Sequence, residues 1–167
     1  MMTIAQIRQY VRLHDQYLYH VTEEEKLEGI LTDGLKPAGG PSNHEATLVD
    51  PNSVYLCSAQ TATWAMDGSL ECDWGGIAVA VDIRQLNPAL FQADEDNWRG
   101  NDDVFWGRIP RDPASLRAHF NPKMDSPRDL WACLVGQGTI AYRGSIPADA
   151  IQVAQTLNDA VAASWAR

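Results

Sequence analysis

YLYHVTEEEKLEGILTDGLKP, residues 17–37, combines a strand pattern and a helix pattern around a single histidine. Its first residues, YLYHV, are rich in aromatic and β-branched side chains, which favours a strand. Thr22 and Glu25 have the spacing of a capping box, in which two side chains satisfy backbone N–H groups at a helix start. We therefore expect a strand that ends near His20 and a helix that begins at Thr22.

The same stretch indicates where this helix should end. Leu27, Ile30 and Leu31 recur at helical spacing and predict one apolar stripe. Gly34 suits the position after the last helical residue, where the left-handed backbone conformation is common. Pro37 cannot continue a helix, because it lacks the backbone N–H. A strand, a short helix and a glycine stop are therefore expected in succession.

Patterns further along the chain predict a mixture of strands and helices. Strands are expected at 53–57, 75–83, 138–144 and 150–157, and helices at about 2–13, 58–66 and 158–166. In the helix at 58–66, Ala62, Ala65 and Met66 should face inward. The elements do not alternate as they would in a doubly wound sheet. We therefore expect an α+β fold: a single domain over 1–167, with its core at 17–157, built from two small, packed, mostly antiparallel sheets.

Composition limits the possible functions. The chain of 167 residues suits one domain, and it has no apolar run of about 18 residues that would indicate a membrane span. The N-terminal segment lacks the continuous apolar centre of a signal peptide, so a cytoplasmic protein is expected. The net charge of −9 argues against broad contact with nucleic acid, which requires clustered Lys and Arg.

The cysteines and histidines show no metal-binding pattern. The three cysteines lie far apart without a CxxC pair, and we interpret them as reduced core residues. The four histidines lack a ligand spacing such as H-x-x-x-H. No metal site is therefore expected. The cysteines are Cys57, Cys72 and Cys133, and the histidines are His14, His20, His44 and His119.

Four segments of the chain, taken in order, resemble the ADP-ribosyltransferase superfamily. They are LYHVT with the following GLKP, then VYLCS, then GIAVAVDI, and finally TIAYRGSIPADAIQV. The superfamily includes diphtheria-toxin-like enzymes, poly(ADP-ribose) polymerases, toxins that modify DNA or proteins, and RNA 2′-phosphotransferases. The resemblance implies that NAD is the substrate and that ADP-ribose passes to a macromolecular or small-molecule acceptor.

The resemblance also implies a function for the histidine of the opening stretch. His20 would hydrogen-bond the adenosine-side ribose of NAD, and the backbone of Val21 would pair with the nicotinamide amide. Thr22 belongs to the same implied NAD-binding segment. Such a site needs a rigid strand end, because NAD is held strained before its glycosidic bond breaks. From the residues alone, an ordinary half-buried histidine is the favoured interpretation of His20, and the resemblance is what favours an NAD contact.

Three residues near the second strand complete the implied NAD site. Tyr55 matches the superfamily's second-strand tyrosine, whose ring would stack on nicotinamide. Ser58 opens the following helix and also suits its N-cap. Trp64 lies where a second stacking ring is often found, and it also suits the core. For Tyr55, too, an ordinary place in a strand remains open.

The usual catalytic glutamate is missing from the expected position. Its carboxylate would bind the nicotinamide ribose and stabilise the positive charge that develops on the sugar. Here the position falls on Gln137, Gly138 or Thr139, depending on the register. Gln137 and Thr139 share one strand face and are the two catalytic candidates, but neither carries a charge.

Because the usual catalytic glutamate is missing, several functions remain open. A transferase could take its negative charge from Asp94, Glu95 or Asp96, although such a run commonly forms a solvated turn. The domain could also bind NAD or ADP-ribose without turnover. RNA 2′-phosphotransferases lack the glutamate too, but they rely on several arginines, and the acidity of this chain argues against RNA.

A protein-interaction module on the same fold is the last alternative. The irregular stretch 84–128 contains Trp98, Phe105 and Trp106, which would form an exposed aromatic patch in such a module. In a transferase the same stretch would recognise the acceptor. Net acidity favours a protein or a small molecule over nucleic acid as that acceptor.

Overall fold

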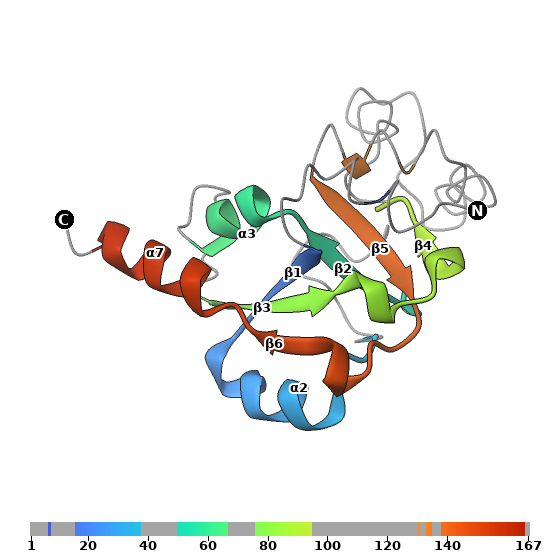
Figure 1. Ribbon diagram of the computed structural model, residues 1–167, viewed down its shortest axis with the longest axis horizontal. Helices are drawn as coiled ribbons and strands as arrows, with labels where there is room; N and C mark the ends of the chain where they lie inside the picture. Colours follow the sequence, from blue (N-terminus) through green and yellow to red (C-terminus); the bar gives the residue numbers. More distant parts are fainter. Residues whose placement is uncertain are drawn as a thin grey trace.

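Six strands form one antiparallel sheet in the computed structural model of the chain (Figure 1). The structure describes residue 7 and residues 16–37, 50–66, 76–94, 130, 133–134 and 138–165. The strands are β1 (Tyr17–Thr22), β2 (Ser53–Cys57), β3 (Ile77–Asp82), β4 (Phe91–Gln92), β5 (Thr139–Arg143) and β6 (Ile151–Val153). Their order across the sheet is β4-β5-β2-β1-β3-β6. The predicted α+β class and antiparallel pairing are confirmed.

The sheet consists of two halves that meet at one residue pair. β1 pairs with β3 along its whole length, and β2 does the same with β5. Between β1 and β2, however, Tyr19 and Cys57 are the sole paired residues of these two fully described strands. We call this β1/β2 boundary the seam. The sequence predicted two sheets, and the structure has one hydrogen-bonded sheet with this narrow junction.

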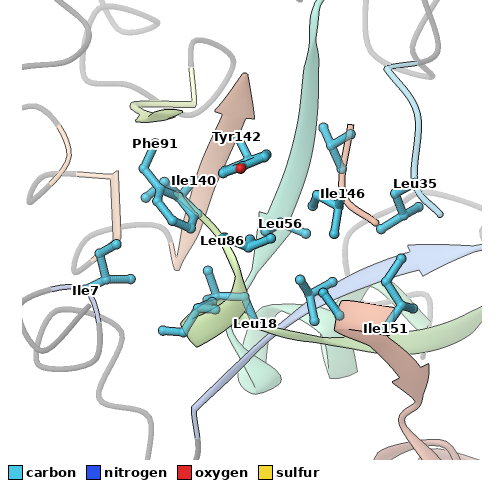
Figure 2. Packing of buried hydrophobic residues seen from close by; sticks show 14 of the residues in the cluster. Ile7, Leu18, Leu35, Leu56, Leu86, Phe91, Ile140, Tyr142, Ile146 and Ile151 are labelled. Carbon is cyan, nitrogen blue, oxygen red and sulfur yellow. The ribbon is translucent and has the colours of Figure 1, made fainter. Parts of the chain in front are cut away.

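One face of the sheet carries the main hydrophobic core (Figure 2). Because side chains alternate along a strand, every second residue of the central strands points into this core. Leu35 and Ile146 lie together at one end of it, where their backbones form an isolated bridge. Central contributions come from Leu18 of β1, Leu56 of β2, Val79 and Val81 of β3, and Ile140 of β5.

The opposite face of β1 and β3 is covered by α3 (Ala59–Met66) and α7 (Gln155–Trp165). Ala78 and Ala80 present only methyl groups there, so the helices can approach closely. The Asn158 side chain fixes α7, because its amide accepts from the N–H of Ala78 at 2.9 Å and donates to the carbonyl of Ala78 at 3.1 Å. α7 was predicted to begin at 158, and this start is wrong: Asn158 binds β3 and is not the N-cap.

The helix after β1 starts later than its sequence pattern predicted. α2 spans Leu27–Asp33 and is preceded by a 3-10 turn at Glu24–Lys26. The capping box at Thr22 is not formed, because Thr22 still belongs to β1 and pairs with Ile77. Leu27 and Ile30 pack on the core as expected. Leu31 is 38% exposed, so its predicted place in the apolar stripe is wrong.

Gly34 ends α2 with a positive φ, as predicted, but outside the left-handed helical region. Its φ is 84° and its ψ is 178°, a combination that is nearly exclusive to glycine. A Cβ at this position would lie 2.2 Å from the carbonyl oxygen of Ile146. Gly34 therefore allows the chain after α2 to bridge to the segment between β5 and β6.

The remaining expectations are confirmed in part. The strands expected at 53–57, 75–83 and 138–144 correspond to β2, β3 and β5. The strand expected at 150–157 is shorter, because α7 begins at Gln155. Ile7 is helical and fully buried, and the rest of the expected N-terminal helix lies outside the described residues. No helix in the described ranges is long and apolar enough to cross a membrane.

Candidate functional site

His20 reaches across the seam and binds the backbone of β2. Its Nδ1 lies 2.9 Å from the carbonyl oxygen of Tyr55. A carbonyl can only accept a hydrogen bond, so the proton is on Nδ1. Burial lowers the pKa of His20, the bond to Tyr55 opposes this shift, and the charge of Lys26 adds to the lowering. The imidazole is therefore neutral near pH 7, and its Nε2 carries a lone pair that can accept a hydrogen bond.

A second side chain crosses the seam in the opposite direction. The thiol of Cys57 donates to the carbonyl oxygen of Tyr19 at 3.4 Å. Burial, and after it the charge of Asp94, raises the pKa of this thiol to about 12. Cys57 is therefore protonated at neutral pH and is unsuited to nucleophilic attack. The seam is thus bridged by one imidazole and one thiol beside the single strand pair.

Tyr55 has a half-buried ring and a hydroxyl with a structural contact. Its hydroxyl oxygen accepts from the N–H of Asp50 at 2.8 Å. The Asp50 carboxylate in turn accepts from the hydroxyl of Ser53 and the side-chain amide of Gln92. Tyr55 therefore anchors the turn that leads into β2. Stacking of its ring on nicotinamide stays a prediction.

The residues expected to bind NAD lie on both faces of the sheet. By the strand register, His20 and Thr22 share the face of the main core, while Val21 and Tyr55 lie on the helix-covered face. Val21 packs against the cluster beneath α3 and α7. The structure brings His20 and Tyr55 together through the main chain of Tyr55, at the seam.

Ser58 and Trp64 both belong to the α3 region, and the structure places them differently from each other. Ser58 is the N-cap of α3, since its Oγ accepts from the N–H of Thr61 at 3.3 Å. The N–H of Ser58 also donates to the carbonyl of Gly138 at 2.7 Å, which joins the end of β2 to the start of β5. Trp64 is 42% exposed, so the expectation that it belongs to the core is wrong.

Thr139 is the first residue of β5 and is only 8% exposed. It pairs with Cys57 across the β2/β5 ladder. Within the part of the chain that the structure describes, its Oγ1 is a buried polar atom that has no hydrogen-bond partner. Gln137, the other candidate for the glutamate position, lies outside the described residues. The structure therefore places one neutral candidate in buried surroundings.

Asp94 does not lie in a solvated turn. It follows β4 and is only 3% exposed. Its carbonyl oxygen accepts from the thiol of Cys133 at 3.5 Å. Phe91, Gln92, Ala93 and Asp94 are all buried, although β4 ends at Gln92, and no alternation in the sequence marks this burial. Glu95, Asp96 and the aromatic residues of 84–128 named above lie outside the described ranges.

Neither a metal cluster nor a known relative identifies the site. In the ranges given above, no three His, Cys, Asp or Glu side chains come together in a way that could hold a metal ion. Comparison with protein-family models, curated proteins and solved structures gives no match to this chain. Its function must therefore be inferred from its own residues and their geometry.

Proposed function

We propose that the chain binds NAD at the seam and acts as an ADP-ribosyltransferase-like protein, with ADP-ribose passing to an acceptor. The observation that carries the proposal is the fixed tautomer of His20. Its Nδ1 is committed to the carbonyl of Tyr55, at 2.9 Å, which leaves Nε2 as an acceptor. A ribose hydroxyl is a hydrogen-bond donor and fits such an atom. This is the interaction that the sequence resemblance assigns to His20.

The surroundings of His20 favour a rigid binding group. β1 is paired with β3 along its length, and Val79, the partner of His20 in that ladder, is fully buried. The hydrogen bond to Tyr55 restrains the imidazole from the other side. A group held in this way loses little conformational entropy when it binds a ligand. Rigidity of this kind suits a site that must hold NAD strained.

The arrangement of the sheet supports the same proposal. We infer that the two halves, β4-β5-β2 and β1-β3-β6, correspond to the two packed sheets expected of an ADP-ribosyltransferase-like fold. The seam, with its single pair at Tyr19 and Cys57, is where such sheets would separate. NAD would then lie beside the residues that cross this boundary.

The acceptor is proposed to be a protein or a small molecule. The net charge of −9 disfavours the phosphate backbone of nucleic acid, because binding it requires release of counterions by clustered cations. The chain carries 22 acidic and only 13 Lys and Arg residues.

Binding of NAD without transfer is the second candidate. The observation that favours it is Thr139, which stands at the start of β5 and has a neutral side chain. A hydroxyl can hold a ribose but cannot stabilise a developing positive charge as a carboxylate does. Release of nicotinamide from NAD separates the two candidates, because only transfer or hydrolysis breaks that bond.

The proposal is tested with two substitutions of the same residue. In His20→Asn, the side-chain amide nitrogen is three bonds from Cα, as Nδ1 is, so the bond to Tyr55 is retained while the acceptor at Nε2 is lost. In His20→Gln, the amide is four bonds from Cα, as Nε2 is, so an acceptor oxygen is restored. Calorimetric titration with NAD should show roughly tenfold weaker binding for His20→Asn, the effect of about 1.4 kcal/mol. His20→Gln should recover part of the affinity.

Two results of this titration would contradict the proposal. One is a folded parent protein that does not bind NAD at millimolar concentration. The other is a folded His20→Asn protein with the affinity of the parent, which would remove Nε2 from the site.

A further inference from the structure

The 3-10 turn η1 (Glu24–Lys26) carries the chain from the end of β1 onto the side of the sheet that holds His20. By the strand register, His20 and Thr22 both project from β1 toward the side of the main core. Leu27, the residue directly after η1, packs against that core, and α2 continues on the same side (Figure 1). η1 therefore lies just beyond Thr22, on the face from which His20 would hold its ligand.

Lys26 combines a fixed backbone with an exposed ammonium group. Its N–H donates to the carbonyl oxygen of Glu23 at 3.0 Å, which closes the turn. Its Nζ lies 2.7 Å from Oε2 of Glu23, and the two side chains are 61% and 56% exposed. The hydrogen bond from Glu23, and then its charge, raise the pKa of Lys26. The ammonium is therefore charged at neutral pH and is accessible to a ligand.

Electrostatics agrees with the placement of this ammonium beside His20. After burial and the opposing bond to Tyr55, the charge of Lys26 is a further influence on the pKa of His20, which it lowers. Such an effect requires that the two groups lie near each other, because exposed charges are screened over short distances.

The other Lys and Arg residues of the described ranges lie elsewhere. Arg84 binds Asp82, which pairs with Tyr17 at the opposite end of β1. By the alternation along β5, Arg143 projects to the face opposite to the main core. Each of the four described cations has a carboxylate partner: Lys26 with Glu23, Lys36 with Asp33, Arg84 with Asp82 and Arg143 with Asp50.

We propose that Lys26 binds the diphosphate of NAD, which takes the place of the Glu23 carboxylate on its ammonium. This inference rests on the proposed function, in which His20 accepts a hydroxyl of the adenosine-side ribose. That ribose is joined to the diphosphate through its own C5′ methylene, so a cation for the diphosphate must lie close to His20. Lys26 meets this requirement, and its flexible stem and three donors suit phosphate oxygens.

The exchange of partners by Lys26 has a physical basis. An exposed ion pair such as Lys26–Glu23 contributes little to the stability of a fold, so its separation is easily offset. A chain with a net charge of −9 repels a diphosphate, and a local cation reduces this repulsion. Glu23 thus competes with the diphosphate for one ammonium.

The first test examines the position of Lys26 without NAD. NMR titration of the His20 imidazole at low ionic strength should show a higher pKa in Lys26→Gln than in the parent. Lys36→Gln is the matched control, because Lys36 forms an equivalent pair with Asp33, at 2.8 Å and with both side chains 62% exposed. It should leave the titration of His20 unchanged. Identical His20 titrations in the parent and in Lys26→Gln would overturn the placement of Lys26 beside His20.

The second test measures NAD affinity by calorimetry at pH 8, where His20 is neutral in every protein. Lys26→Gln should bind NAD about fivefold more weakly than the parent at low ionic strength. Lys26→Arg keeps the charge and should retain most of the affinity, and Lys36→Gln should match the parent. Added salt should weaken NAD binding by the parent more than by Lys26→Gln, because the lost contact is between charges.

The third test uses the partner of the lysine and reverses the sign of the effect. Glu23→Gln removes the competing carboxylate and should bind NAD roughly twofold to threefold more tightly than the parent. Asp33→Asn is its control, because it removes the same charge from the Lys36 pair, and it should match the parent. Lys26→Gln and Glu23→Gln both break the same ion pair, so a merely structural pair would change NAD affinity in the same direction in both.

The outcomes distinguish this inference from the proposed function. Opposite changes in NAD affinity for Lys26→Gln and Glu23→Gln, at unchanged melting temperature, support Lys26 as the diphosphate-binding residue. A folded Lys26→Gln protein with the NAD affinity of the parent, or weaker binding in both variants, overturns the role of Lys26 and leaves the contact of His20 intact. A parent that fails to bind NAD overturns the proposed function, and the role of Lys26 with it.

Discussion

His20 combines a structural contact at one ring nitrogen with a second ring nitrogen that has no hydrogen-bond partner among the described residues. Its Nδ1 holds the backbone of β2 across the seam, while Nε2 remains available as an acceptor. Burial keeps the imidazole neutral by lowering its pKa. Protonation would add a charge to a desolvated ring and turn Nε2 from an acceptor into a donor. The structural and the proposed functional roles therefore require the same protonation state.

Because the folded protein keeps His20 neutral, we predict that the protein is less stable in mild acid than at neutral pH. The pKa of His20 is lowered in the folded state relative to 6.5, so the unfolded chain binds more protons between the folded pKa and 6.5. The free energy of unfolding should therefore fall as the pH decreases below 6.5, and it should show no such loss from His20 above that value. Urea denaturation of the parent and of His20→Asn between pH 5 and 8 measures the effect.

The comparison between the two proteins isolates His20 from other titrating groups. His20→Asn retains the donor to Tyr55 but cannot be protonated, so its stability should depend less on pH in this range. Superimposable pH profiles for the two proteins would show that His20 is not the group responsible.

At the level of elements, the backbone at the end of α2 ties two distant segments together. Leu35 and Ile146 exchange backbone hydrogen bonds of 2.9 and 2.8 Å directly after Gly34. Both side chains are buried at one end of the main core (Figure 2). α2 is thereby fixed to the connection between β5 and β6. The GLKP and SIP segments of the sequence thus meet in space.

Two glycines of this region should respond to alanine in opposite ways. Gly34→Ala should lower the free energy of unfolding by more than about 2 kcal/mol, because alanine is strained at this φ and ψ and its Cβ would collide with the carbonyl of Ile146. Gly29→Ala is the matched control: it lies inside α2 with open space around it and should raise stability by about 0.5–1 kcal/mol. Chemical denaturation of both variants measures these changes, and a Gly34→Ala protein as stable as the parent would contradict the tight approach.

Local sequence patterns predicted most strands but few helix boundaries. The runs in β1, β2 and β3 are apolar and β-branched, and this composition is sufficient to identify them. The start of α2 was misplaced because pairing of Thr22 with Ile77 in the β1/β3 ladder prevents the capping box. The start of α7 was misplaced because Asn158 binds β3. Both errors come from contacts between distant residues, which a local pattern does not contain.

Only part of the candidate site could be predicted from the sequence. The position of His20 at the end of a strand follows from its neighbours, and the resemblance drew attention to it. Its partner is a main-chain carbonyl, which no sequence pattern marks. The burial of Asp94 depends on the pairing of β4 with β5, an interaction across nearly fifty positions of the chain. The order of strands, and with it the seam, is likewise a property of the whole fold.

For the molecule as a whole, the sheet separates an apolar side from a more polar one. The main core fills one face, and α2 lies on this side, while α3 and α7 lie on the other (Figure 1). On this second face, β2, β4 and β5 carry buried polar residues, including Ser53, Gln92 and Thr139. The seam borders this polar part. The proposed NAD site therefore lies where the sheet is least tightly joined, with His20 on the core face of the seam and these polar residues on the other face.

The most direct test of the central claim observes His20 itself during titration with NAD. Long-range proton–nitrogen NMR spectra resolve the two imidazole nitrogens, and the His20→Asn protein identifies which signals belong to His20. Without NAD, Nδ1 should be protonated and Nε2 should not. Addition of NAD should then shift the Nε2 signal saturably, with a smaller change at Nδ1, because Nε2 receives a ribose hydroxyl. Unchanged His20 signals at NAD concentrations up to several millimolar would contradict NAD binding at the seam.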